Sequence, residues 1–232
     1  LETGKEVQQL LGHQDVVCCL ALSRSETILA SGSEDETAIL WNMDSYEQLF
    51  VLQLKSPVNA LDFSVDGQRL FTGSIEGYLS SFAATGSREL LNSTRAHDSF
   101  LDSLCTTTDG QYVATASEYD NSIKLWKAHT LDFEATLVGH TRGVMGVVAT
   151  DSGKDNPMLV SASRDRTIKI WDLKTYQEIR TLEGHEGWVY SVAVSYDKKH
   201  IISGGVDRIV RLWCFHTGKL ISCFEGHTDR IR

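Results

Sequence analysis

Apolar and polar residues form short runs along the whole chain of 232 residues. Between residues 144 and 185 four such runs follow one another, VMGVVAT, MLVSAS, TIKIWDL and EIRTLEGH, separated by turn-rich pieces such as DSGKDNP and SRDR. Runs of about four to eight residues that alternate or are continuously apolar, with frequent β-branched residues, are typical of β-strands. No window carries a convincing amphipathic helix. The pattern therefore predicts an all-β protein.

This four-strand pattern repeats along the chain. Gly-His or Ala-His pairs end at His13, His97, His140, His185 and His227, at intervals of 84 (twice 42), 43, 45 and 42 residues. Five units are thus present, and the second has lost its His and its Trp. The predicted repeats are approximately 5–47, 48–90, 91–132, 133–177 and 178–220, with the start of a further repeat at 221–232. All of them belong to one domain, 1–232.

The spacing inside a unit is similar to that of a known family. A Gly-His pair is followed 22–25 residues later by Asp and six residues further by Trp, as in the run that ends at Trp171-Asp172. This pattern resembles the WD40 repeat, and the resemblance covers the entire chain. It implies a β-propeller whose blades are four-stranded antiparallel sheets arranged around a channel.

The ends of the chain bear on whether the propeller closes. The opening stretch LETGKEVQQLLGH looks like an outer strand, so five units of four strands plus this one predict 21 strands. We expect an open segment of a larger propeller of about seven blades, with exposed sheet edges. The alternative is a closed five-bladed ring in which Lys5–Leu11 completes the last blade.

A histidine, a serine, an aspartate and a tryptophan recur in these units. These residue types also build hydrolytic sites, but a catalytic site is needed once, whereas this set repeats at one spacing. The resemblance implies a hydrogen-bonded tetrad that ties each blade together, so no catalytic residue is predicted and a hydrolase is a much weaker alternative. The three sets are His13, Ser31, Asp35 and Trp41; His140, Ser161, Asp165 and Trp171; and His185, Ser203, Asp207 and Trp213.

Two units depart from this set. The third has one extra residue in SEYDNS and carries His97, Thr115, Asp120 and Trp126. At the places of His, Asp and Trp, the second has Leu54, Glu76 and Phe82. We expect the second blade to hold together by packing alone and to be the least stable of the five. Drift in a tolerant repeat is favoured over a functional specialisation.

The predicted binding surface is one edge of the propeller. With the strands of a blade named a to d in chain order, WD40 proteins commonly bind partners on the edge that carries the d–a and b–c turns. Aromatic residues, Met and Arg are over-represented at interface hot spots. The predicted protein-binding residues on this edge are Phe100, Tyr119, Met145, Arg164, Trp188 and Tyr190.

Tyr119 and Tyr190 are the strongest candidates, because each stands at a predicted edge with a polar tip to satisfy, and the other four residues also have a simpler interpretation. Phe100 and Trp188 could pack between blades, Met145 could fill a gap at the channel mouth, and Arg164 could be a solvated turn residue or pair with a neighbour. If the edge does bind a partner, an acidic or phosphorylated peptide could be steered toward Arg164.

Composition and charge narrow the function classes. The net charge of -9 argues against broad nucleic-acid binding. That charge is uneven, because residues 1–116 hold 6 Lys and Arg against 16 Asp and Glu, while residues 117–232 hold 16 against 15. The five cysteines have an odd count and no metal-ligand spacing, so we expect no metal site, no disulfide framework and a reducing, cytoplasmic location, with the nucleus not excluded. The longest apolar run, VVCCLAL, is too short to span a membrane.

The sequence therefore favours a non-catalytic scaffold that recognises a partner protein or peptide through the edge of the d–a and b–c turns, without a cofactor or a small-molecule substrate. The alternative is a sensor or regulatory propeller attached to a nucleotide-switching or catalytic domain outside this segment.

Overall fold

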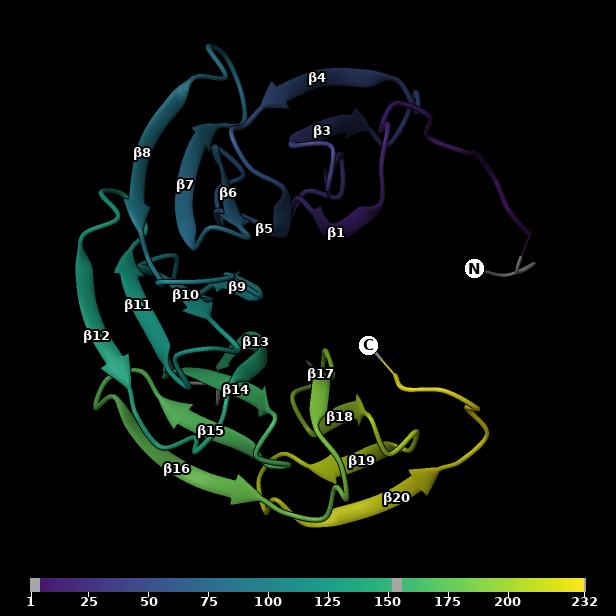
Figure 1. The fold of residues 1–232 in the computed structure, drawn as a ribbon, viewed down its shortest axis with the longest axis vertical. Coiled ribbons are helices and arrows are strands. Elements are labelled where there is room, and N and C mark those ends of the chain that lie inside the picture. Colours follow the sequence, from purple (N-terminus) through teal and green to yellow (C-terminus); the bar gives the residue numbers. More distant parts are fainter. Residues whose placement is uncertain (1–4, 152–155, 232) are drawn as a thin grey trace.

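Five four-stranded sheets follow one another along the chain in the computed structural model, which describes residues 5–151 and 156–231 (Figure 1). In every sheet consecutive strands pair antiparallel in the order a-b-c-d. Because the connections are short turns, each sheet is a meander made by one continuous stretch of about 40 residues. The predicted fold, five antiparallel four-stranded blades, is confirmed.

The strands are as follows, with strand a innermost and strand d outermost in each blade. Blade one has β1 (Val17–Leu22), β2 (Ile28–Ser33), β3 (Thr37–Asn42) and β4 (Gln48–Gln53). Blade two has β5 (Val58–Phe63), β6 (Arg69–Ser74), β7 (Tyr78–Ala83) and β8 (Leu90–Arg95). Blade three has β9 (Ser103–Thr106), β10 (Tyr112–Ala116), β11 (Ile123–Lys127) and β12 (Phe133–Leu137). Blade four has β13 (Val144–Asp151), β14 (Pro157–Ser163), β15 (Ile168–Asp172) and β16 (Gln177–Leu182). Blade five has β17 (Val189–Val194), β18 (His200–Gly205), β19 (Val210–Cys214) and β20 (Leu220–Phe224).

The core lies between neighbouring blades rather than inside any one of them. In the cluster between blades one and two, Leu40 and Leu52 of the first blade pack with Leu61 and Phe63 of the second. A single sheet cannot cover its own apolar faces, so each blade is stabilised mainly by its neighbours.

The five blades form an open arc, and the two chain ends lie on either side of the gap (Figure 1). Leu20 on the inner strand of blade one is 64% exposed, whereas its equivalent Leu61 in blade two is 6% exposed. At the other end Phe224 is 53% exposed, and its equivalent Leu137 in blade three is 1% exposed. Apolar positions that a neighbouring blade buries inside the arc are therefore exposed to solvent at both of its ends. Blade five has its own outer strand β20, so the alternative of a five-bladed ring completed by Lys5–Leu11 is wrong.

The predicted strand at the start of the chain is not present. Residues 5–12 belong to no strand, and residues 1–4 lie outside the described part, so the described residues contain 20 strands where the sequence predicted 21. An outer strand pairs only with strand c of its own blade. No strand c lies beside residues 5–12 in the described structure, so no β-ladder forms there.

A β-bulge marks the start of the inner strand in four blades. The registers of β1, β5, β13 and β17 against their neighbours each skip one residue at the same place. A bulge leaves one residue unpaired and re-aims its side chain. The residues left over are Cys18, Asn59, Met145 and Tyr190.

Candidate functional site

The repeated histidines, hydroxyls and tryptophans form the predicted hydrogen-bonded sets. In blade four, His140 Nδ1 lies 2.7 Å from Asp165 Oδ2 and His140 Nε2 lies 2.8 Å from Ser161 Oγ. The indole N–H of Trp171 donates to the same Ser161 Oγ at 2.8 Å. Because a carboxylate only accepts, the Nδ1–H of His140 must donate to Asp165, which leaves Nε2 to accept from the serine hydroxyl. The set links strands b and c to the d–a turn.

The aspartate of each set is the acceptor for several donors. Asp165 accepts hydrogen bonds from the backbone N–H groups of Thr141 and Thr167 and from the hydroxyl of Thr167, at 3.1, 2.9 and 2.6 Å. Burial alone would raise the pKa of Asp165, but the hydrogen bonds from His140 and Thr167 outweigh burial and hold that pKa below its ordinary value. The carboxylate therefore stays charged and fixes both turns of the edge.

Four blades contain such a set, one more than the three intact sets of the sequence. In blade three the His97 ring lies 2.5 Å from Asp120 and 2.8 Å from Thr115, and Trp126 donates to Thr115 at 2.9 Å. Threonine supplies the same hydroxyl as serine, and the longer b–c turn still brings the aspartate to the histidine. Blade three therefore departs from the pattern in sequence but not in bonding.

The weak hydrolase alternative conflicts with the burial of the hydroxyls. Ser31, Thr115, Ser161 and Ser203 are at most 4% exposed. A nucleophile must reach its substrate, and each of these oxygens is instead enclosed and bonded to a tryptophan. The sets are structural.

The d–a and b–c turns, which carry these histidines and aspartates, lie on one edge of the propeller. We call it the His edge. A chain of contacts crosses it from blade three to blade five. The rings of Phe100 and Tyr119 meet edge to face at 5.4 Å, and those of Trp188 and Tyr190 at 6.5 Å. Between the two pairs, the guanidinium of Arg164 lies 4.5 Å from the centre of the Trp188 ring.

Glu118 connects the two halves of this chain of contacts. Its carboxylate, next to Tyr119 in sequence, forms an ion pair with Arg164. Asp102 lies beside this pair and accepts the N–H of Glu118 at 2.7 Å. Burial raises the pKa of Asp102 to about 7, because burial and the charge of Glu118 together outweigh the hydrogen bond from the Glu118 N–H, which lowers that pKa. Arg164 is thus already paired with a neighbour, which is one of the two simpler interpretations that the sequence allowed, and it is not a free cation.

The structure places all six predicted binding residues at this edge, and brings five of them together. Phe100 and Trp188 are 36% and 37% exposed, so neither is buried between blades. Met145 is half-buried at the bulge of β13 and lies outside this connected set. Whether these residues bind a partner stays a prediction.

Comparison with known proteins decides the family. The family described as "WD domain, G-beta repeat" matches residues 4–42, 47–87, 88–127, 131–172 and 176–214. The chain belongs to the WD40 repeat family. The matched repeats are out of step with the blades, because the repeat that begins at residue 47 opens with β4, the outer strand of blade one. WD40 repeats are generally non-catalytic and typically mediate protein interactions.

Several curated proteins are similar to this WD40 chain. Nuclear distribution protein nudF of Aspergillus niger is 29% identical over 193 residues, which cover 82% of the chain and 33% of that protein. F-box-like/WD repeat-containing protein TBL1X of Mus musculus is 26% identical, with 79% of the chain and 36% of that protein covered. Apoptotic protease-activating factor 1 of Danio rerio is 27% identical, with 79% and 14% covered. The chain therefore spans about a third or less of these relatives.

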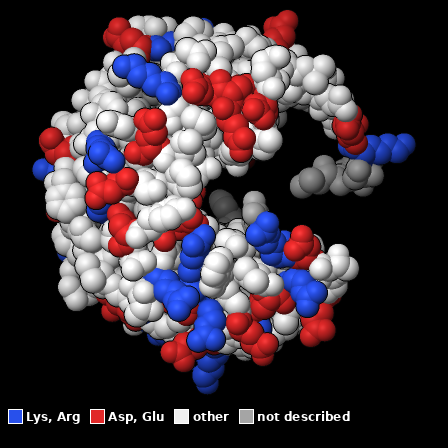
Figure 2. Space-filling view, in the orientation of Figure 1, with Lys and Arg blue, Asp and Glu red and all other residues white. Residues whose placement is uncertain are grey.

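Charge divides the WD40 arc into two halves. On the face shown in Figure 2, acidic side chains gather over blades one and two beside the gap, and basic side chains gather over blades four and five. The turns of the His edge lean the same way, although Lys55 lies in the first half and Glu183, Glu186, Glu225 and Asp229 lie in the second. Blades one to three carry Asp15, Glu34, Glu36, Glu76, Asp98 and Glu118, and blades four and five carry Arg142, Arg164, Arg166 and Arg208.

Beside Trp188 the His edge has a hollow of about 470 Å³. It is lined by Arg166, Glu186, Gly187, Trp188, Tyr190, Val206, Arg208, Thr228, Asp229 and Arg230. We call it the Trp188 hollow. The sequence prediction had found its aromatic wall but not its arginines.

A signal in the sequence could have found two of these arginines. Arg166 and Arg208 each follow the aspartate of the b–c turn, where the other blades have Glu36, Gly77 and Asn121. The backbone φ at this position is positive in every blade, from 57° to 83°. Glycine and asparagine are the residues that adopt this conformation most readily, so an arginine there is unusual.

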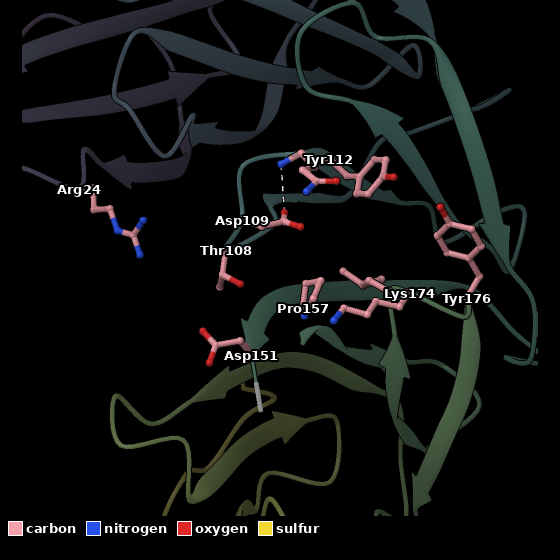
Figure 3. A pocket seen from close by; sticks show the side chains of 10 residues that line it. Arg24, Thr108, Asp109, Tyr112, Asp151, Pro157, Lys174 and Tyr176 are labelled. Carbon is pink, nitrogen blue, oxygen red and sulfur yellow. Dashed lines mark hydrogen bonds between the residues drawn. The ribbon is translucent and has the colours of Figure 1, made fainter. Parts of the chain in front are cut away.

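The opposite edge, formed by the a–b and c–d turns, has a second hollow of about 600 Å³. In Figure 3 Thr108 and Asp151 project between Arg24 of blade one and Pro157, Lys174 and Tyr176 of blade four. The hydroxyl of Tyr176 donates to Glu134 at 2.8 Å. This lining is of mixed charge and shares no residue with the predicted binding surface.

The described part of the chain holds no group of three or more His, Cys, Asp or Glu that could bind a metal ion. No helix in that part is long and apolar enough to cross a membrane.

Proposed function

We propose that this WD40 chain is a protein-interaction scaffold that binds a partner protein or peptide on the His edge of blades three to five. The observation that carries the proposal is the connected set of Phe100, Tyr119, Arg164, Trp188 and Tyr190. Aromatic and arginine side chains of this kind dominate binding energies at interfaces.

The physical state of these side chains supports the proposal. Trp188 and Tyr119 keep a large part of their surface in solvent although both have neighbours that hold them in place. A side chain that is already ordered loses little conformational entropy when a partner covers it. The edge is therefore both exposed and pre-organised.

Affinity capture with mass spectrometry on the full chain tests the proposal. The Trp188→Ala and Tyr190→Ala variants should each lower the affinity for a captured partner by about 1–3 kcal/mol without unfolding the protein. Lys174→Ala, on the opposite edge, is the matched control and should retain the partner. A partner that tolerates both aromatic truncations would contradict the proposal.

The second candidate is a sensor propeller attached to a nucleotide-switching or catalytic domain. It is favoured by the small share of the relatives that the chain spans, as little as 14% in a protein whose name describes activation of a protease. The reading frame of the full-length protein distinguishes the two candidates. For either one we propose a reducing compartment, the cytoplasm or nucleus, because all five cysteines are free.

A further inference from the structure

We propose that the Trp188 hollow takes an acidic, extended segment of the partner protein. Its Asp and Glu side chains bind Arg166, Arg208 and Arg230, and its apolar side chains contact Trp188 and Tyr190. The inference rests on the proposed function and adds to it the chemistry of the partner.

The first argument is that these arginines are available. All three are exposed, and their side chains take part in no ion pair or hydrogen bond with the described residues. Two less exposed cations nearby differ, since the half-buried Arg164 pairs with Glu118 and the buried Arg211 pairs with Asp207. Guanidinium groups that are free and close to an aromatic wall bind carboxylates strongly, because the fork of donors matches the two carboxylate oxygens.

The second argument is the backbone conformation that carries two of them. Arg166 has φ of 73° and Arg208 has φ of 64°, values at which residues other than glycine and asparagine are strained. Blades two and three fill the same turn position with Gly77 and Asn121 without that strain, and blade one fills it with Glu36 at φ of 64°. The fold does not need an arginine here, so the two arginines point to a use outside the fold.

The third argument concerns how the charges are distributed. Arg166 and Arg208 occupy equivalent positions on successive blades, and Arg230 follows in the next d–a turn. The three cations therefore come from three different turns along the arc that line one hollow. Cations carried by several turns suit an extended segment with several carboxylates, whereas a single phosphoryl group is best held by donors that converge on one point.

The carboxylates of the edge favour the same ligand. Glu186 and Asp229 line the hollow together with the three arginines, and they would repel a phosphate dianion or a nucleic-acid backbone more than single carboxylates. Beyond the hollow, the acidic turns of blades one to three repel the rest of an acidic segment. The segment is thus oriented, with its acidic part on blades four and five.

Selection of peptides tests the inference. A library of random 12-residue peptides is displayed and selected on the full chain, and the bound pool is sequenced. The expected result is an excess of Asp and Glu interleaved with apolar residues. Affinity of a selected peptide should fall steeply with salt.

Two variants separate the arginines from the fold. Arg166→Asn with Arg208→Asn copies the residue of blade three, so the double variant should melt at the same temperature as the parent or higher, yet bind a selected acidic peptide about tenfold or more weakly. The control is Arg24→Asn on the opposite edge, which should leave binding unchanged.

The outcomes are distinguishable. If selected peptides depend on Trp188 but show no acidic excess, or bind the double variant equally well, the inference is wrong and the proposed function stands. If a single-phosphoserine peptide or a single-stranded RNA oligonucleotide binds and the acidic peptides do not, the inference is likewise wrong. If no selected peptide depends on Trp188 or Tyr190, the proposed function fails with it.

Discussion

Blades two and four have the same four strands and the same turns, yet they are held together in different ways. Blade four joins its turns and strands through His140, Ser161, Asp165 and Trp171. Blade two has Phe82 in place of the tryptophan and no such set among the described residues. Both nevertheless form complete sheets, because their neighbours bury their faces. The hydrogen-bonded set therefore adds stability to a blade but is not needed to specify its fold.

Blade two also carries a polar residue at a buried position that is apolar in other blades. The residue before the tryptophan is Leu40, Leu125 or Ile170 in other blades, and in blade two it is Ser81. Ser81 is 0% exposed, and its hydroxyl has no hydrogen-bond partner. A buried hydroxyl without a partner costs free energy, so blade two lacks the set and also carries an unfavourable group.

The largest expected effect is the loss of a tetrad aspartate. Asp165→Ala removes the acceptor of His140, Thr141 and Thr167 and should lower the free energy of unfolding by about 1–3 kcal/mol. The matched change in blade two, Glu76→Ala, removes an exposed side chain and should cost clearly less. Denaturant melts of both variants make the comparison. Equal losses of stability in the two variants would show that the hydrogen bonds of Asp165 do not stabilise blade four.

The buried aspartates of the two blades should make stability depend on pH in opposite directions. In blade two, burial raises the pKa of Asp62 to about 6, whereas an unfolded aspartate titrates near pH 4. The native state holds a proton that the unfolded chain releases, so this group lowers stability as pH rises from about 4 to 6. The tetrad aspartate of blade four has a lowered pKa, so its stabilisation is complete above about pH 4 and is lost as pH falls further.

Asp62→Asn tests this difference. The variant should be more stable than the parent at pH 8, by roughly 1–2 kcal/mol, because no charge is then buried. At pH 4 the two should be equal. Melting curves at both pH values give the answer, and a gain that is the same at pH 4 and pH 8 would rule out ionisation as its cause.

The smallest expected effect is a gain. Ser81→Ala removes the unpartnered hydroxyl and should raise the free energy of unfolding by about 1 kcal/mol. The same substitution in blade five, Ser203→Ala, removes the partner of His185 and Trp213 and should lower it. The comparison between the blades holds only if one Ser→Ala change stabilises and the other destabilises in the same thermal melt.

The fold was predictable because its signals are local and repeated. The histidine, aspartate and tryptophan spacing gave the blades, and Thr115 could have been accepted into the set because it keeps a hydroxyl. Pairing of Arg164 with a neighbour was one of the interpretations from the sequence, but Glu118 as its partner was not predictable, since it lies 46 residues away on another blade. For the same reason the free state of Arg166 and Arg208 could not be inferred. Whether a surface cation is paired depends on its neighbours in space.

The strand expected at residues 5–12 failed for a related reason. Its residues have the pattern of an outer strand, but a strand exists only when another strand supplies hydrogen-bond partners. Sequence pattern records which residues are suited to a strand, and the presence of the partner is a property of the assembled sheet.

The two bare ends of the arc have a consequence for symmetry. The end at β1 presents Val17, Leu20 and Leu22, and the other end presents Ile202 and Phe224. These two faces differ from each other. Inside the arc, a face of the first kind always packs against a face of the second kind on the neighbouring blade. Two copies would thus meet head to tail, a contact that does not close on itself as a two-fold dimer does. Without further blades at its ends, this segment should form linear oligomers that lengthen with protein concentration, and light scattering over a dilution series would reveal them.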